Sequence, residues 1–255
     1  MHNRLEGRVA IITGGGHGIG KAYARRLADE GAAIVIAELD SKAGEAVAKE
    51  LIDRGYRALA IRTDVADQTS AEAMARQAAE ELGKIDILVN NAAVFATVAM
   101  SRVPFDQIDP AEWDKLMAVN LRGTWFACRA VVPYMRMQGY GKIINISSGT
   151  YLDGSPSRIH YVTSKAGIIG FTRTLARELG KDNICVNALV PGSTLSEENP
   201  DESVLKLRSG PVASRALKRI QRPEDLVGAL AFFASPDSDF ITGQSLVVDG
   251  GSVMQ

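Results

Sequence analysis

Short, uniformly apolar segments alternate with longer amphipathic segments along the whole chain. A strand with one face in water would alternate apolar and polar residues, whereas these segments are apolar at consecutive positions. The pattern therefore predicts strands that are buried on both faces. The seven predicted strands cover residues 8–13, 33–38, 58–63, 85–90, 142–147, 184–190 and 244–249.

Helical patterns fill the intervals between these strands. We expect helices over residues 18–30, 41–53, 70–82, 111–137, 161–179 and 224–234. Glycine, which is preferred just after a helix C-terminus, closes five of them; these glycines are Gly31, Gly55, Gly83, Gly139 and Gly180. Alternating strands and helices predict an α/β fold, a doubly wound parallel sheet of about seven strands with helices on both faces.

Residues 193–218 form the one long stretch without a clear period. They follow the carboxyl end of the predicted strand 184–190, where a doubly wound fold binds its ligands. We therefore expect this stretch to form a substrate lid. No repeat, charge block or low-complexity linker divides the sequence, so residues 1–255 are expected to form a single domain.

Composition and charge exclude several classes of function. The 255 residues are 46% hydrophobic and 23% charged, with a net charge of -1, so we expect no binding to nucleic acid or to an anionic membrane. No stretch approaches the length of apolar sequence that a membrane span or a secretory signal needs. Cys128 and Cys185 lie in apolar segments, which favours buried thiols and a cytoplasmic location.

The three histidines, His2, His17 and His160, lack the spacing of metal ligands. Zinc sites place their His and Cys ligands at short, repeated intervals, and this sequence has none. No metal site is expected.

A glycine-rich segment, TGGGHGIG, ends the first strand and opens the first helix. Glycines allow the backbone to approach a pyrophosphate closely, and the N–H groups and dipole of the following helix attract it. We predict a nucleotide-binding turn that contains Gly14, His17, Gly18, Ile19 and Gly20. A glycine-rich turn without a ligand is the alternative.

Glu38 ends the second strand, eighteen residues after Gly20. A carboxylate at this place can accept hydrogen bonds from both ribose hydroxyls of adenosine, and it would repel a 2′-phosphate. We therefore expect NAD rather than NADP, with Leu39 beside the ribose. The alternative is a solvated acid at the end of a strand.

Small and polar residues also end other strands. Asp64 and Val65 follow the third strand, Asn91 and Ala92 the fourth, and the pair Pro191-Gly192 the sixth. Such residues allow a nucleotide to come close, although each short motif alone is weak evidence.

Asn120 lies inside the predicted helix 111–137, where asparagine is disfavoured. Either its side chain or a local distortion of the helix faces the site, or Asn120 is exposed by chance. The sequence leaves both interpretations open.

Tyr161 and Lys165 are four residues apart in a predicted helix, so they share one face. A lysine charge at about 4 Å favours the phenolate by roughly 4 kcal/mol, and we expect it to lower the pKa of the phenol by about 3 units. Ser148, thirteen residues earlier on another element, could offer its hydroxyl to the same oxygen. From these residues alone, an exposed tyrosine–lysine pair is the alternative.

In this order and at these spacings, the motifs resemble those of the short-chain dehydrogenase/reductase family in its single-domain form. The resemblance spans nearly the whole chain. Its motifs are TGxxxGxG at 13–20, DV at 64–65, NNA at 90–92, VNL at 119–121, S-x12-Y-x3-K at 148–165, PG at 191–192 and ITGQSLVVDGG at the C-terminus.

The resemblance implies a Rossmann-like dinucleotide-binding and catalytic domain with a catalytic tetrad of Asn120, Ser148, Tyr161 and Lys165. Tyr161 would be the acid–base group, and Ser148 would orient and polarise the carbonyl. Lys165 would lower the pKa of the phenol and bind the nicotinamide ribose, while Asn120 would hold a water in the proton relay. Asp64 would face the adenine ring.

The sequence departs from the family pattern at three places. Ala93 replaces the usual glycine after Asn-Asn-Ala, and His17 stands where serine or arginine is common. The threonine that usually contacts the carboxamide corresponds loosely to Thr194. The expected cofactor-binding residues are Gly14, His17, Gly18, Ile19, Gly20, Glu38, Leu39, Asp64, Val65, Asn91, Ala92, Tyr161, Lys165, Pro191, Gly192 and Thr194.

We therefore predict an NAD-dependent oxidoreductase that interconverts a small secondary alcohol and its ketone. The expected pocket residues are Phe95, Thr150, Tyr151, Arg158 and His160, and the surrounding sequence resembles members that act on aryl alcohols or pyridoxal. Two alternatives remain, a 3-oxoacyl-thioester reductase and a non-catalytic nucleotide-binding module. The resemblance also implies a homotetramer, with helix 161–179 and the C-terminus at its contacts.

Overall fold

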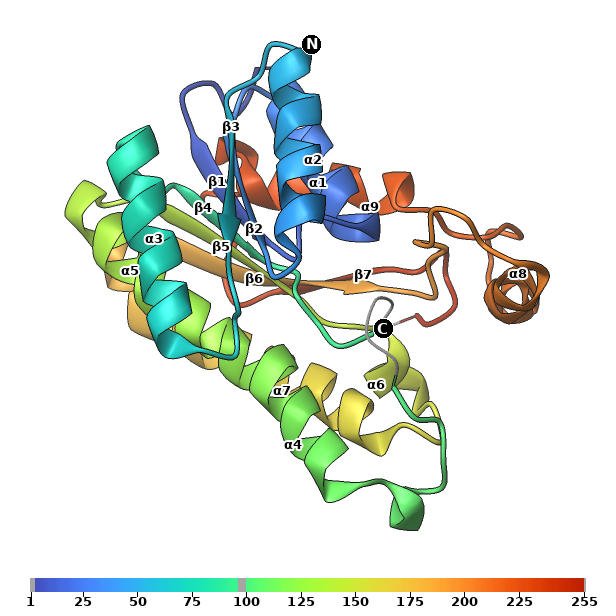
Figure 1. Cartoon of the computed structure of the whole chain (residues 1–255). Helices are drawn as coiled ribbons and strands as arrows, with labels where there is room; N and C mark the ends of the chain where they lie inside the picture. Colours follow the sequence, from blue (N-terminus) through green and yellow to red (C-terminus); the bar gives the residue numbers. More distant parts are fainter. Residues whose placement is uncertain (1–2, 96–99, 255) are drawn as a thin grey trace.

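The computed structural model describes residues 3–95 and 100–254. A parallel sheet runs through its centre in the order β3-β2-β1-β4-β5-β6-β7 (Figure 1). This confirms the predicted doubly wound α/β fold. The strands are β1 (Val9–Thr13), β2 (Ala33–Glu38), β3 (Ala58–Arg62), β4 (Ile87–Asn90), β5 (Gly141–Ile146), β6 (Ile184–Pro191) and β7 (Ser245–Val248).

Helices connect the strands, close to the predicted positions. They are α1 (Gly18–Asp29), α2 (Ser41–Asp53), α3 (Gln68–Leu82), α4 (Pro110–Met117), α5 (Gly123–Gln138), α6 (Thr150–Asp153), α7 (Ile159–Leu179), α8 (Glu202–Ser209) and α9 (Glu224–Ala234). Within the described ranges, no helix combines the length and the apolar character needed to span a bilayer.

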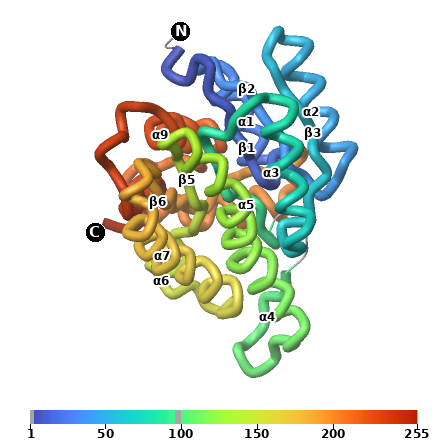
Figure 2. Tube along the Cα trace, turned by 90° about the vertical axis from the view of Figure 1, so that its left-hand side faces the viewer, coloured from blue at the N-terminus to red at the C-terminus, as the bar shows by residue number. Residues whose placement is uncertain are grey.

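The helices cover both faces of the sheet, as Figures 1 and 2 show. One core packs the sheet against α1, α2 and α9, and the other packs it against α3, α5 and α7. In β1, Ala10 and Ile12 enter the first core, while Val9 and Ile11 enter the second. Because both faces are covered, most positions of the strands are apolar on either side of the sheet.

The predicted helix over 111–137 contains a distortion. A π-helical turn, η2 (Ala118–Arg122), joins α4 to α5, and Asn120 lies within it. Turns of this kind widen a helix locally and are frequent at functional sites. The structure therefore favours the first interpretation of Asn120, in which a local distortion of the helix accommodates it, over chance exposure.

The five glycines expected at helix ends all lie within two residues of a helix C-terminus, as predicted. Four of them have a positive φ: Gly31, Gly55, Gly83 and Gly139. The fifth, Gly180, directly follows the last residue of α7 but has a φ of -58°. The chain continues through a 3-10 turn, and Asn183 takes the left-handed conformation with a φ of 55°. Asparagine tolerates this conformation better than most residues.

The segment 193–218 is not irregular throughout, because it contains α8 and a 3-10 turn, η4 (Gly210–Ala213). Asp201 caps α8 by accepting a hydrogen bond from the Val204 N–H at 2.9 Å. The buried Arg215 donates to the Ser193 carbonyl at 2.6 Å and ties the two ends of the segment together. In Figure 1, α8 projects away from the sheet.

Candidate active site

A cleft of about 860 Å³ lies at the carboxyl ends of the strands. It opens where the strand order reverses between β1 and β4, the place at which doubly wound folds bind ligands. Asn120 is buried near this cleft, while all the other predicted site residues line it: Gly14, His17, Gly18, Ile19, Gly20, Glu38, Leu39, Asp64, Val65, Asn91, Ala92, Ser148, Tyr161, Lys165, Pro191, Gly192 and Thr194.

The turn between β1 and α1 packs tightly against the end of β4. The Asn91 side chain donates to the carbonyls of Thr13 and Gly14, at 3.1 and 2.9 Å. Gly14 has a φ of 64°, and a Cβ there would lie 2.9 Å from the Cα of Ala92. Only glycine satisfies both conditions, so the motif fixes the floor of the cleft.

The first turn of α1 suits an anion. The N-cap residue His17 makes no capping bond through its side chain within the described chain, and the turn contains no acidic residue. The N–H groups of this turn and the positive end of the helix dipole are therefore left without a competing carboxylate.

Glu38 is held at the β2 end of the cleft by backbone donors. Its carboxylate accepts hydrogen bonds from the N–H groups of Gly16, Leu39 and Asp40, at 3.0, 2.9 and 3.3 Å. A Cβ on Gly16 would lie 2.9 Å from the Glu38 Cγ, so glycine is needed for this approach. Arg62 lies opposite Glu38 in the sheet and lines a separate hollow of about 60 Å³.

Tyr161 and Lys165 project from α7, and both side chains are buried. The Lys165 Nζ donates to the Ile146 carbonyl at the end of β5 at 2.9 Å, and it lies 5.9 Å from the centre of the Tyr161 ring. Burial lowers the pKa of Lys165 to about 8, because the charged form loses solvation.

The electrostatics of Tyr161 differ from the prediction. Burial is the largest effect, and it raises the pKa of the phenol above its ordinary value. The Ser148 hydroxyl and the charges of Arg158 and Arg208 act in the opposite direction. The expectation that Lys165 brings the pKa of Tyr161 towards neutrality was wrong. Burial of the phenol raises its pKa by more than the nearby cations lower it, and an argument from residue spacing does not include burial.

Asn120 links α7 to the segment that follows β4. Its Oδ1 accepts from the Val94 N–H at 2.8 Å, and its Nδ2 donates to the Ser164 Oγ at 3.1 Å. Ser164 in turn donates to the Tyr161 carbonyl at 2.7 Å. The π-helical turn thus places Asn120 where it links both segments, and its part in a proton relay stays a prediction.

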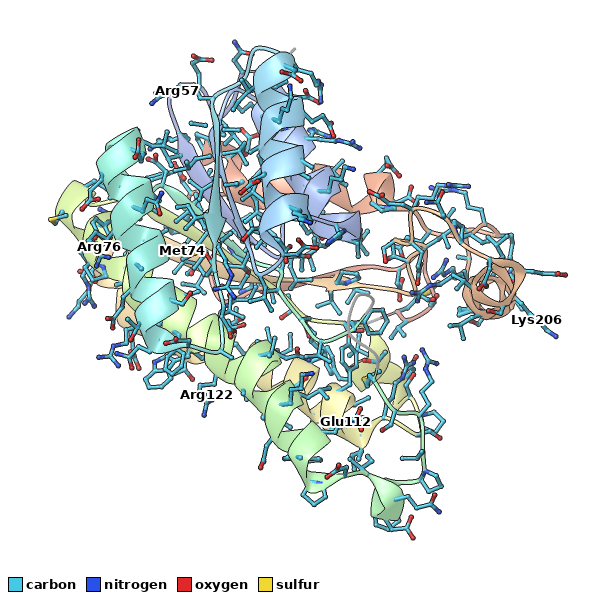
Figure 3. All side chains as sticks on the ribbon, in the orientation of Figure 1. Arg57, Met74, Arg76, Glu112, Arg122 and Lys206 are labelled. Carbon is cyan, nitrogen blue, oxygen red and sulfur yellow. The ribbon has the colours of Figure 1, made fainter. Side chains whose placement is uncertain are left out.

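Three of the expected pocket residues, Phe95, Thr150 and Arg158, line the cleft. The expectation was wrong for Tyr151 and His160, which lie away from the cleft as the described residues define it. His160 is fully buried, with its Nε2 3.7 Å from the carboxylate of Glu112 on α4 (Figure 3). Adjacent residues of a helix point in different directions, so His160 cannot share the orientation of Tyr161.

Comparison with known proteins identifies the family. A family model described as "Enoyl-(Acyl carrier protein) reductase" matches residues 14–253. The chain is 36% identical over 250 residues to the hydroxy(phenyl)methyl-succinyl-CoA dehydrogenase subunit BbsD of Thauera aromatica, covering 97% of each chain. It is 34% identical over 254 residues to the 3-oxoacyl-acyl-carrier-protein reductase FabG of Thermotoga maritima, covering 98% of this chain and 100% of that protein. The chain belongs to the short-chain dehydrogenase/reductase family.

A solved structure of the same family supports this assignment. A variant of a Serratia marcescens short-chain dehydrogenase/reductase superposes with a TM-score of 0.88 at 35% identity, covering 98% of this chain and 99% of that one. Members of this oxidoreductase family use a nicotinamide cofactor, either NAD or NADP. The uncapped first turn of α1 fits its pyrophosphate, and the fixed carboxylate of Glu38 fits the adenosine ribose.

Sequence reasoning missed Arg102 and Lys115 of this short-chain dehydrogenase/reductase cleft, since neither belongs to a motif. It included Arg208 and Arg215 only within the segment 193–218, and Asp249 only within the C-terminal motif, without naming them as site residues. Only the packing of α4, α8 and the C-terminal segment brings them to the cleft.

Metal ligation finds no support in the described ranges, where no group of three or more His, Cys, Asp or Glu residues could hold an ion. His2, named among the histidines above, lies outside those ranges. Cys128 and Cys185 are both buried free thiols, as the composition predicts.

Proposed function

We propose that this protein is an NAD-dependent oxidoreductase that interconverts a small secondary alcohol and its ketone, with Tyr161 as the acid–base group. One observation carries the proposal. Tyr161, Ser148 and Lys165 line the same cleft as the glycine-rich turn and Glu38. A proton-transfer group and a dinucleotide site therefore share one cavity, which is what alcohol oxidation needs.

The chain handles the proton while the cofactor, when bound, accepts a hydride from the alcohol carbon. The Tyr161 Oη takes the proton of the alcohol as the carbonyl forms. Ser148 holds the substrate oxygen beside the phenol, and its hydroxyl also lowers the pKa of Tyr161. The buried ammonium of Lys165 adds positive charge near the phenolate.

Glu38 supports NAD as the cofactor. Its carboxylate is held by three backbone N–H donors, so it cannot easily swing away from the ribose. A 2′-phosphate would bring about two negative charges next to it. The lone pair that these three donors leave free on the same carboxylate suits a ribose hydroxyl.

A 3-oxoacyl-thioester reductase is the second candidate, and the similarity to FabG favours it. The reductase reaction would use the same residues in the opposite direction, with NADPH as the usual donor. Glu38 argues against NADPH, so cofactor preference separates the two proposals. A non-catalytic nucleotide-binding module would bind NAD without turning over any substrate.

The test is a panel of secondary alcohols with NAD and with NADP, and of 3-oxoacyl thioesters with NADH and NADPH, followed at the nicotinamide absorbance. The proposal expects reduction of NAD by at least one alcohol, and loss of that activity in Tyr161→Phe. Turnover of thioesters alone, with NADPH, would assign the reductase function. NAD binding without any turnover would assign the non-catalytic module.

A further inference from the structure

We propose that the alcohol substrate carries a carboxylate, which binds among Arg102, Arg158 and Arg208. These three residues, here called the arginine cluster, line the cleft on the side of Tyr161. The inference rests on the proposed function, because it names the substrate class of the same site. The three guanidinium groups gather at one part of the cleft, the buried Nε of Arg208 has no acceptor, and Arg102 and Arg158 form no ion pair within the described ranges.

Arg208 is the most deeply placed member. It lies at the end of α8 with only 5% of its surface exposed. One terminal nitrogen pairs with Glu197, but the buried Nε has no hydrogen-bond partner within residues 3–95 and 100–254. A buried N–H without an acceptor is costly, so this donor points to a ligand that supplies one.

Two ring contacts connect Arg208 to the reacting centre. Its guanidinium carbon lies 5.5 Å from the centre of the Phe95 ring. The Phe95 ring in turn lies 5.1 Å from the ring of Tyr161. The charge of Arg208 also acts directly on the Tyr161 phenol. A small molecule bound by Arg208 through one end can therefore place its other end beside the Tyr161 hydroxyl.

Arg158 lies three residues before Tyr161, at the start of α7. It is half-buried and donates to the Ser155 Oγ at 2.8 Å, and within the described ranges it forms no ion pair. Burial is the main cause that lowers its pKa, and the charge of Arg102 adds to that effect. Cations that disfavour one another in this way are stabilised when an anion binds between them.

The acidic groups on this side of the cleft do not balance the cluster. Glu197 pairs with Arg208, and Asp153 is an exposed residue whose carboxylate accepts from the Ser155 N–H at 3.0 Å. Arg102, on the segment after β4, pairs with neither of them. Two guanidinium groups therefore remain for a ligand.

The planar guanidinium forms two parallel hydrogen bonds with a carboxylate, a geometry that a neutral alcohol cannot reproduce. The reaction would convert a hydroxy-carboxylate and NAD into an oxo-carboxylate, NADH and a proton. The carboxylate itself does not react and serves to position the alcohol carbon. In an aryl alcohol with a carboxylate, the carboxylate can bind the arginine cluster while the aryl ring packs against Phe95.

A binding measurement tests the inference without requiring turnover. The protein saturated with NAD is titrated calorimetrically with the ketones para-acetylbenzoate, meta-acetylbenzoate and levulinate, and with the carboxamide of each. Since NAD cannot reduce a ketone, only binding is observed. We expect at least one acid to bind at least about tenfold more tightly than its amide.

Variants assign that preference to the cluster. Arg158→Met and Arg102→Met should each remove most of the difference between acid and amide. Arg57→Met is the matched control, because Arg57 is exposed and precedes β3 at the end of the sheet opposite the cleft (Figure 3). The inference is overturned if amides bind as tightly as acids, if no acid binds below about 10 mM, or if both cluster variants keep the preference.

Turnover of the matching alcohols distinguishes failure of this inference from failure of the proposed function. Oxidation of neutral alcohols with no preference for the acid forms would overturn the carboxylate and leave the alcohol dehydrogenase standing. Selective binding of the acids without reduction of NAD by any alcohol would overturn the proposed dehydrogenase function and leave the carboxylate site standing.

Discussion

At the residue scale, the proposed chemistry depends on the pKa of the Tyr161 phenol. Burial raises its pKa, and Ser148, Arg158 and Arg208 lower it. Oxidation of an alcohol requires the phenol to accept a proton, so the ionised form is the active one. The rate of oxidation should therefore rise with pH until Tyr161 is ionised.

Replacing Tyr161 by phenylalanine removes the proton acceptor and keeps the ring against Phe95. We expect kcat to fall by at least about a thousandfold while NAD affinity is nearly kept. Tyr151→Phe is the matched control, since Tyr151 packs against Ile169 and Val190 away from the phenol. More than a tenth of wild-type turnover in Tyr161→Phe would refute the assignment.

Ser148→Ala tests how the Ser148 hydroxyl affects the pKa of Tyr161. Because the Ser148 hydroxyl lowers the pKa of Tyr161, its removal should raise that pKa further. The rising limb of kcat/KM for oxidation should then move to higher pH, and activity at neutral pH should fall. The measurement is a pH profile of both proteins. A limb that stays in place or moves to lower pH contradicts the prediction.

Glu38 decides the cofactor in our proposal. Charge-assisted hydrogen bonds contribute roughly 1.5–3 kcal/mol, and repulsion of a phosphate adds to the difference, so NAD should be preferred about a hundredfold or more in kcat/KM. Glu38→Ala should reduce this preference, mainly by weakening NAD. Glu45→Ala, on the exposed surface of α2, serves as the control. A wild type that uses NADP as well as NAD would show that Glu38 does not bind the ribose.

At the element scale, α8 belongs to the segment 193–218, which we expect to act as a lid. This segment contacts the rest of the chain near its two ends, through the Lys21–Glu198 ion pair and the backbone hydrogen bonds of Leu195, Ala216 and Leu217, and α8 lies between these contacts. Arg208 belongs both to this segment and to the arginine cluster, so a bound carboxylate would hold α8 against Phe95. Weakly anchored elements of this kind are the ones that move on binding.

We expect amide hydrogen exchange in 193–218 to slow when NAD and an oxo-carboxylate are added together. The physical reason is the extra acceptor for Arg208, which α8 carries. Helix α3, which packs in the second core together with α5, should keep its exchange rate. Strong and equal protection of 193–218 before and after addition would argue against a lid.

At the scale of the whole molecule, α7 and the β7 edge of the sheet each leave an uncovered surface among the described residues. On α7, Ala166 is exposed, and a Cβ on Gly170 would meet no atom within 4 Å among the described residues. At the edge of the sheet, β7 leaves Leu246 38% exposed, and the neighbouring Phe240 is fully exposed. Small residues allow close helix contacts, and an exposed apolar edge strand favours pairing.

We therefore expect a homotetramer with two-fold symmetry, measured by light scattering at micromolar concentration. Gly170→Gln should disrupt it, because the new side chain has room in the single chain but would block close approach of a second α7. Ala46→Gln, at an exposed position of α2, is the matched control. A wild-type mass of 27.3 kDa would refute the prediction.

The sequence by itself determined the sheet, its helices and most of the lining of the cleft. Short, uniform apolar runs predict strands that are covered on both faces, and the glycines of TGGGHGIG predict a turn that a pyrophosphate can approach. Such features depend on neighbours in the chain or on backbone geometry, so local pattern carries them. The motifs around Glu38, Ser148 and Tyr161 are of this kind.

Tertiary structure alone decided the electrostatics and the substrate side. The raised pKa of Tyr161 comes from burial by distant segments, and the charge of Arg208 acts on the phenol from α8. Arg102 lines the same cleft from the segment after β4. His160 and Asn183 show the same limit at short range, since packing selects which side chain faces a cavity and which residue ends a helix. Burial and long-range charge are sums over the whole fold, and no local pattern contains them.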